Sequence, residues 1–295
     1  MSKRTVSRAP LIASLLVALS SLTAVSHAAA GQAGEWRAYA ADKAGSKYSP
    51  LDQIDAESVH DLRVVWRQST LPDDTRQGNT MRAPGASQNT PLMAGGLLYI
   101  STALGMVTAL DATTGEVVWF DAPPAREGQP RERGFATRGV AYWNGGTDGS
   151  GATGHDDARI LAVLGSRLVA LDAKTGAREP DFGDGGEVDL VQGYDDRVVE
   201  SFRWRSAPLV VNDVVVIGSA IGDIISATMP ALKEMPPGDV RGFDVRTGEQ
   251  LWIFHTIARE GEPGNETWLT GLNEDRASWE YTGNTNMWAS PSADE

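Results

Sequence analysis

The hydrophobic residues of this chain fall in short runs that are separated by turn-forming residues. The clearest runs are Leu97–Ile100, Arg159–Leu164, Leu168–Leu171, Leu209–Val211 and Val214–Ile217. Apolar positions at helical spacing are weak throughout, so the pattern predicts an all-β protein. Gly95-Gly96 precedes one run and Asn212-Asp213 separates two others, and both pairs indicate tight hairpins.

Three of the apolar runs lead into nearly the same turn sequence, Asp-x-x-Thr-Gly. The copies are Ala109–Gly115, Ala170–Gly176 and Gly242–Gly248, and the first and third continue to Trp119 and Trp252. The aspartates of successive copies are 61 and 72 residues apart. Each copy predicts a strand, a turn with glycine at the position of positive φ, and a second strand. A recurring unit of this kind is typical of the four-stranded blades of a β-propeller.

The number of units predicts a propeller ring that is incomplete. Units end at Trp66, at Trp119, near Pro180 and at Trp252, and a fifth begins at Ser278. We therefore expect about four to five blades, with the last one truncated at the C-terminus, since propellers close with about four to eight blades. The alternative is a complete small propeller of four long blades, but no terminal strand remains to fasten such a ring.

Residues 1–30 predict a secretory signal peptide rather than a part of the fold. Basic residues precede the apolar stretch Leu11–Val25, and small residues suitable for cleavage follow it. An uncleaved membrane anchor is the alternative, although this stretch is short for a bilayer span. The propeller would then occupy residues 31–295, in a periplasmic protein that could associate peripherally with the inner membrane.

The composition excludes several other classes of function. The chain has 295 residues, a net charge of −13 and no cysteine. An acidic protein lacks the basic footprint that nucleic-acid binding needs. Without cysteine there is no disulfide, no thiolate metal site and no Cys-x-x-Cys-His haem attachment. The four histidines show no metal-ligand spacing, and no Gly-x-Gly-x-x-Gly supports nicotinamide chemistry.

The repeated Asp-x-x-Thr-Gly-x-x-x-Trp unit resembles the tryptophan-docking repeat of the quinoprotein dehydrogenases, which use pyrroloquinoline quinone (PQQ). Four further motifs follow in the order of that family: Arg205–Pro208, Gly218–Asp223, Val240–Asp244 and Asn284–Ala289. The chain looks most similar to the glucose and sugar dehydrogenase branch. The resemblance implies an eight-bladed propeller of about twice this length, of which the chain would be the N-terminal half.

The same resemblance implies a PQQ site. Trp288 falls where the family has the tryptophan beneath the cofactor, and an indole offers a planar quinone a large flat face. Asn286 would share that face and bond the cofactor rim. Arg138 matches an arginine that holds a cofactor carboxylate. Ser206 would hydrogen-bond the cofactor, and Gly222 would let the backbone approach it closely.

Asp223 aligns with the acidic ligand of the catalytic cation, usually calcium, because a hard cation prefers anionic oxygen ligands. Gln88 stands where relatives often carry a glutamate against the cofactor, and glutamine keeps a hydrogen bond but loses the charge. Leu104 stands where glucose dehydrogenases carry a histidine. These last two departures weaken an assignment to glucose.

Each of these residues also has a purely structural interpretation. Trp288 could dock one blade on the next, and Arg138 could be a surface arginine beside a loop. Asp223 could be a solvated turn aspartate, and Ser206 could cap the end of a strand.

The resemblance implies an oxidoreductase that oxidises a sugar or alcohol hydroxyl with PQQ and a divalent cation. Electrons would pass to a quinone or to an external carrier such as a cytochrome, since the chain has no haem motif. The family's base is an aspartate in a His-Asp-x-Trp-Asp type of motif that this sequence does not contain. We therefore assign no catalytic residue here and expect the chain alone to be inactive. The alternative is a non-catalytic exported propeller, such as a scaffold for outer-membrane protein assembly.

Overall fold

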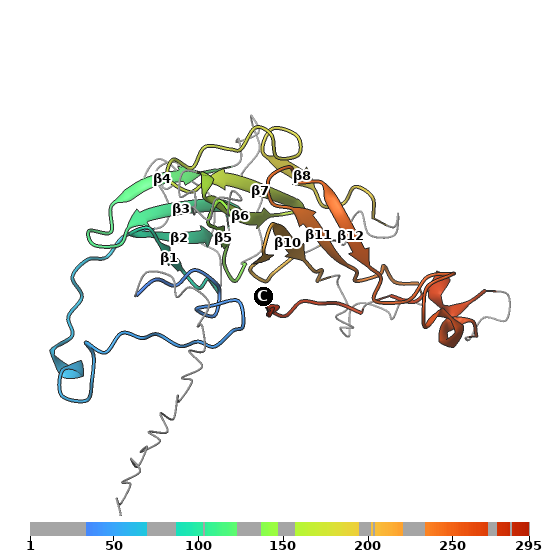
Figure 1. The fold of residues 1–295 in the computed structure, drawn as a ribbon, viewed down its shortest axis with the longest axis horizontal. Coiled ribbons are helices and arrows are strands. Elements are labelled where there is room, and N and C mark those ends of the chain that lie inside the picture. The colour runs from blue at the N-terminus through green and yellow to red at the C-terminus, as the bar shows by residue number, and fades with distance from the viewer. Residues whose placement is uncertain are drawn as a thin grey trace, which may run out of the picture. The chain divides into compact units, whose positions relative to one another are not determined.

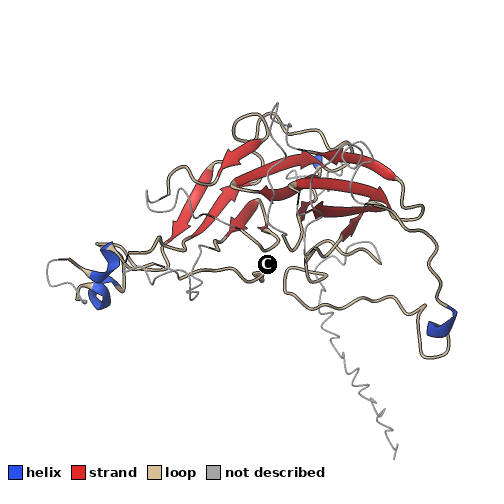
Figure 2. Cartoon of the chain, turned by 180° about the vertical axis from the view of Figure 1, so that it is seen from behind, coloured by secondary structure: helices blue, strands red, loops and turns tan. Residues whose placement is uncertain are grey.

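The computed structural model describes the following residues: 34–69, 87–102, 104–122, 137–146, 157–194, 202, 204–220, 234–270, 276–283 and 285–294. The expected signal peptide at 1–30 lies outside them. Within this part of the chain, strands dominate, and the helical elements are short 3-10 turns, η1 (Val59–Asp61), η4 (Asn265–Trp268) and η5 (Ser278–Glu280) (Figure 2). The prediction of an all-β chain is confirmed. No helix among the described residues is long and apolar enough to cross a membrane.

In the described part of the chain, twelve strands form three four-stranded antiparallel sheets, in which neighbouring strands are consecutive in the chain (Figure 1). The first sheet contains β1 (Leu92–Ala94), β2 (Leu97–Thr102), β3 (Met106–Asp111) and β4 (Val117–Asp121). The second contains β5 (Ala141–Trp143), β6 (Arg159–Leu164), β7 (Arg167–Asp172) and β8 (Glu187–Asp189). The third contains β9 (Leu209–Val211), β10 (Val214–Ile217), β11 (Val240–Asp244) and β12 (Gln250–Phe254). Each sheet is one blade of the expected propeller.

The first and last units of the sequence are only partly formed in the described part of the chain. The unit that ends at Trp66 and the unit that begins at Ser278 have no four-stranded sheet among the described residues. The four to five blades expected from the sequence therefore correspond to three complete blades with a partial unit on either side. This arrangement matches part of a propeller ring.

The repeated turn has the conformation that its sequence predicts. Gly115, Gly176 and Gly248 have φ values of 75°, 72° and 73°, in the left-handed region that glycine adopts without steric cost. The carboxylate of Asp111 accepts hydrogen bonds from the backbone N–H groups two and three residues later, at 2.9 and 2.7 Å. The same bonds recur at Asp172 and Asp244. The motif therefore specifies a turn that reverses the chain between the third and fourth strands of a blade.

The hydrophobic core lies between adjacent blades, as the middle blade makes clear. Along β6, Ile160 and Ala162 pack with side chains of the first blade, whereas Leu161 and Val163 pack with those of the third. Successive strand residues point to opposite faces, so this blade is buried on both sides. Its strands accordingly appear in the sequence as continuous apolar runs rather than as alternating ones.

Tryptophans join consecutive units. The indole of Trp119, at the end of the first blade, lies on Gly176 of the second blade and donates to the carbonyl of Ala173 at 3.1 Å. Trp66 lies on Gly115 in the same way and donates to the carbonyl of Ala112 at 3.3 Å. A Cβ atom on either glycine would be only 2.5 Å from the indole, so the turn needs glycine for space as well as for φ.

The junction between the second and third blades is built differently. Phe182 and Val188 pack near Gly248, where the other junctions have an indole. The backbone N–H of Gly183 donates to the carbonyl of Thr247 at 2.8 Å. The unit that ends near Pro180 thus docks through its backbone and smaller apolar side chains. This agrees with the sequence, in which that unit has no tryptophan at the corresponding position.

Candidate functional site

The candidate site is built from the chain segments that lead into the first strands of the blades. The backbone N–H of Thr90, before β1, donates to the carbonyl of Arg138 at 2.8 Å. The N–H of Arg138, before β5, donates in turn to the carbonyl of Arg205, before β9, also at 2.8 Å. Gly139 makes this close approach possible, because a Cβ there would be 3.0 Å from the carbonyl oxygen of Thr90. The three segments therefore form one hydrogen-bonded row.

Arg138, Ser206 and Trp288 converge at this row. The guanidinium of Arg138 donates through Nη1 to Ser206 Oγ at 3.1 Å and to the carbonyl of Trp288 at 3.2 Å. Its Cζ also lies 5.3 Å from the centre of the Trp288 ring, which is a cation–π contact. Ser206 is fully buried, whereas Trp288 is 54% exposed. The backbone of Trp288 is thus held in place while much of its side chain remains exposed.

Asn286 packs against the third blade, beside the residue that precedes β11 by two. Its Oδ1 lies close to Gly238, where an added Cβ would be 2.8 Å away. The structure therefore brings together three of the side chains that the resemblance implied, those of Arg138, Ser206 and Trp288.

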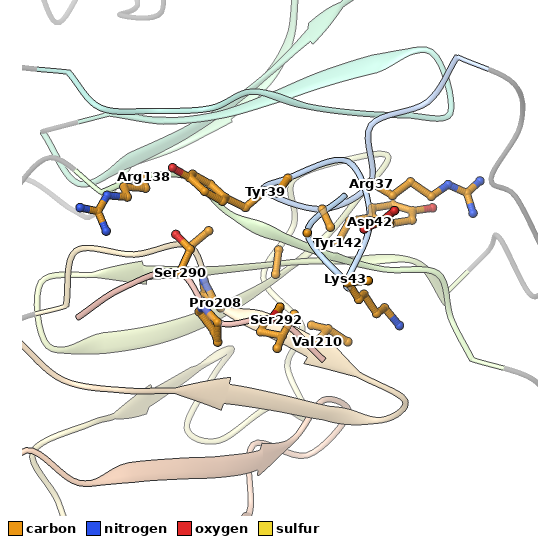
Figure 3. A pocket seen from close by; sticks show the side chains of 18 of the residues that line it. Arg37, Tyr39, Asp42, Lys43, Arg138, Tyr142, Pro208, Val210, Ser290 and Ser292 are labelled. Carbon is orange, nitrogen blue, oxygen red and sulfur yellow. The ribbon is translucent and has the colours of Figure 1, made fainter. Parts of the chain in front are cut away.

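A cavity of about 470 Å³ adjoins Arg138 and Trp288 (Figure 3). Its walls come from four parts of the chain: residues 37–47, 138–142, 207–210 and 288–292. Figure 3 shows the Arg138 side chain on one side of the labelled set and those of Arg37 and Lys43 on the other. A cavity of this volume is large enough for a small ligand.

Two buried polar atoms near this row lack a hydrogen-bond partner among the described residues. They are Oγ of Ser290, which lines the cavity, and Oδ1 of Asn89, whose Nδ2 donates to Ser101. Buried polar atoms are normally paired, and unpaired ones often mark a place where water or a ligand binds. Ser290 lines the cavity, so its Oγ is the one available to a molecule bound there.

The polar side chains of the cavity wall are held in defined charge states. Burial raises the pKa of Tyr142, against the effect of the guanidinium of Arg37, which lies 5.6 Å from its ring centre. Tyr142 is therefore a neutral hydroxyl at physiological pH. Hydrogen bonds from Ser46 lower the pKa of Asp42, which stays ionised. The wall thus combines neutral, anionic and cationic groups.

The comparison with known protein families agrees with this architecture. The family model for the "Glucose/ethanol/alcohol dehydrogenase, beta-propeller domain", the PQQ family, matches residues 36–295. The chain belongs to this family. Curated members include quinoprotein glucose dehydrogenase A of Acinetobacter calcoaceticus, 31% identical over 79% of this chain and 29% of the relative. The glycerol dehydrogenase large subunit of Gluconobacter oxydans is 31% identical over 88% of this chain and 32% of the relative.

This PQQ-family chain spans about a third of the length of those curated relatives. Solved structures show the same fold. A quinohemoprotein alcohol dehydrogenase of Pseudomonas putida HK5 superposes with a TM-score of 0.61 and 24% identity, over 89% of this chain and 33% of that one. A europium-containing methanol dehydrogenase gives a TM-score of 0.60 with 23% identity, over 89% of this chain and 41% of that one.

The remaining implied residues lie elsewhere or outside the described part. Gln88 is exposed, two residues before Thr90 in the hydrogen-bonded row. Leu104 is 3% exposed and is not among the residues that line the cavity, so it behaves as a core side chain. Gly222 and Asp223 lie outside the described residues. No group of three or more potential metal ligands occurs among the described residues.

The sequence reasoning missed the first wall of the cavity, residues 37–47. Ala41 and Lys47 there have positive φ values of 77° and 56°, which are uncommon for residues with a Cβ. The backbone N–H of Ala293 donates to the carbonyl of Lys43 at 2.8 Å, so this wall is tied to the segment that carries Trp288. The only sequence signal for this loop was its turn-forming residues, Asp42 and Gly45.

Proposed function

We propose that this chain provides part of a PQQ site in an oxidoreductase that acts on the hydroxyl group of a sugar or an alcohol. Membership of the quinoprotein dehydrogenase family supports the reaction class. The observation that carries the proposal is the Arg138–Ser206–Trp288 arrangement, in which one cation and one open aromatic face lie side by side.

The residues present fit such a ligand. PQQ is flat and carries carboxylates, and the exposed indole of Trp288 offers a flat surface for it. Arg138 has more donors than its two hydrogen bonds through Nη1 use, so it can also bind a carboxylate. The unpaired Oγ of Ser290 adds a polar atom to the cavity wall.

The chain's own residues would bind and orient. Trp288 supports one face of the ligand, Arg138 neutralises a carboxylate, and Asn286 contributes an amide near the rim. When bound, PQQ supplies the two-electron oxidant for a CH–OH group. Arg138 also lies over the indole, so a bound carboxylate and the ring would share one positive charge.

The cation, the electron acceptor and the location are further parts of the proposal. Asp223 is the residue we assign to a divalent cation, by its alignment with the family motif. Electrons would pass to a quinone or a cytochrome, and residues 1–30 would direct the protein to the periplasm. We assign no catalytic base within this sequence.

Equilibrium binding tests the proposal. PQQ is titrated into the full chain, with and without calcium, and its affinity is compared with that of Trp288→Ala and Arg138→Gln. We expect each change to weaken binding about tenfold, because each removes a contact worth about 1.4 kcal/mol. Trp268→Ala is the matched control, since Trp268 does not line the cavity. Equal affinities for the wild type, Trp288→Ala and Trp268→Ala would contradict the proposal.

A further inference from the structure

The segment that carries Trp288 is held along its backbone by the third blade and the loops beside it. The hydroxyl groups of Thr285 and Thr256 lie 2.5 Å apart, and Thr256 is the second residue after the end of β12. Gly238, just before β11, packs against Thr285, and a Cβ there would be 2.6 Å from its carbonyl oxygen. The approach to Trp288 is therefore fixed three residues before the indole.

Gly218 receives the next part of the segment. It directly follows β10, and a Cβ there would be 2.4 Å from the carbonyl oxygen of Met287. Neither Gly218 nor Gly238 has a positive φ, so the backbone conformation does not require glycine at these positions. Space does, because any side chain would push the backbone of 285–287 away from the blade.

Ser206 holds the last residue of the segment. Its Oγ donates to the carbonyl of Trp288 at 2.6 Å and accepts from Nη1 of Arg138 at 3.1 Å. A serine hydroxyl has one proton, so this hydroxyl has none left to donate to a ligand. Its burial is complete, whereas Trp288 is 54% exposed. Ser206 thus contacts both binding residues from beneath rather than facing the open side of the indole.

We propose that Ser206 and Gly218 are positioning residues that set the height and orientation of the Trp288 indole and the place of Arg138 beside it. Ser206 acts on a ligand through these two side chains and makes no direct bond to it. This inference rests on the proposed function for the identity of the ligand, but not for the positioning itself. It reassigns Ser206, for which the sequence resemblance implied direct contact with the cofactor.

The test follows the Trp288 signal and the ligand affinity separately. Near-ultraviolet circular dichroism and fluorescence of the full chain are recorded for the wild type, Ser206→Ala and Ser206→Thr. Each is repeated with Trp288→Phe, so that the difference isolates the signal of Trp288 from the other tryptophans. PQQ affinity is measured for the same proteins. Ser101→Ala is the matched control, because Ser101 is also buried and hydrogen-bonded, to Asn89 and Thr137, but does not contact Trp288.

The expected result is a changed Trp288 signal and about fivefold to tenfold weaker PQQ binding in Ser206→Ala, from the loss of one hydrogen bond to each partner. Ser206→Thr keeps the hydroxyl and should restore affinity to within about twofold. Ser101→Ala should change neither quantity. Gly218→Ala should change the Trp288 signal in the same sense, with Ser206 intact.

A Ser206→Ala protein with an unchanged Trp288 signal but weaker binding would overturn the inference, since Ser206 would then contact the ligand directly. Unchanged signal and unchanged affinity would overturn it as well. If the wild type binds no PQQ while Ser206→Ala still changes the Trp288 signal, the positioning role stands and the proposed function fails. Urea unfolding of each variant identifies one that does not fold, in which case the Ser206→Thr and Gly218→Ala comparisons decide.

Discussion

Trp119 should be one of the most sensitive positions in the fold, although it is far in sequence from its partners. Its indole is 7% exposed, lies on Gly176 of the next blade and donates to the carbonyl of Ala173. Trp252 has the same position in its own unit but is 40% exposed, and the glycine that its ring lies on, Gly242, belongs to its own blade. The two tryptophans therefore form a natural pair for comparison.

The size of the effect follows from burial. Replacing a buried tryptophan by alanine costs about 3–5 kcal/mol in lost contacts and cavity. Trp119→Ala also leaves the carbonyl of Ala173 without this hydrogen-bond donor, and the cost of that loss is included in the range of about 3–5 kcal/mol. We expect about 1–2 kcal/mol for Trp252→Ala, since much of its surface already contacts solvent. At about 2–4 °C per kcal/mol for a chain of this size, the Tm should fall by roughly 10 °C for Trp119 and by a few degrees for Trp252.

A double-mutant cycle measures the contact between Trp119 and Gly176 directly. Gly176→Ala puts a Cβ 2.5 Å from the Trp119 indole and also strains a backbone with φ of 72°. In the Trp119→Ala background the clash is gone and only the backbone strain remains, about 1 kcal/mol. Urea unfolding should therefore give a coupling energy of at least about 1 kcal/mol between the two changes. Additive effects, or equal losses for Trp119→Ala and Trp252→Ala, would refute the view that the indole joins the blades.

Three further predictions concern charged groups. Arg178→Lys should lower the free energy of unfolding in urea by about 1–2 kcal/mol, because a lysine cannot reproduce the paired bonds of 3.1 and 2.9 Å to Asp121. In an Asp121→Asn background, most of the difference in stability between Arg178 and Lys at this position should disappear. At Asp244, partial burial works to raise the pKa, but N–H groups of its own turn donate to the carboxylate and lower it overall. The ionised carboxylate therefore stabilises the fold at pH values above the ordinary pKa of aspartate, and this stabilisation is lost as the pH falls through the lowered pKa. Asp244→Asn should therefore flatten the change in the free energy of unfolding between pH 5 and pH 2. Burial raises the pKa of Asp239 despite nearby His255, so folding favours the protonated form. The stabilisation from this protonated carboxyl is lost as the pH rises through the raised pKa. Asp239→Asn should remove this loss in urea titrations at pH 4 to 8, and an unchanged pH profile would contradict the burial argument.

The blades could be predicted from the sequence because their signals are local. The turn at Asp111 needs its carboxylate and Gly115, and both act within five residues of chain. The alternation along β6 is equally local, and its continuous apolar run already indicates burial on two faces. The docking of Trp119 on Gly176 also follows once the units are aligned, because the turn glycine recurs in all three copies and the tryptophan in the first and third.

The candidate site is less visible in the sequence because its contacts join distant segments. Arg138 and Trp288 are 150 residues apart, and only the resemblance to a family suggested that they belong together. No spacing rule relates Ser206 to either of them. The cavity wall at 37–47 depends on residues with unusual φ, such as Ala41, and on a backbone bond from Ala293 to Lys43. Bonds between backbones carry almost no residue preference, so sequence patterns cannot reveal them.

The contrast between Gly115 and Gly218 explains why a glycine can be easy or hard to interpret. Gly115 stands in a repeated turn and has a positive φ, so its role can be recognised from the five residues around it. Gly218 has an ordinary φ and is needed only because the carbonyl of Met287, about seventy residues later, occupies the place of its side chain. A mutation there would act on Trp288 without touching any ligand. The shape of this site is therefore set as much by close backbone packing between blades as by the side chains that would meet a ligand.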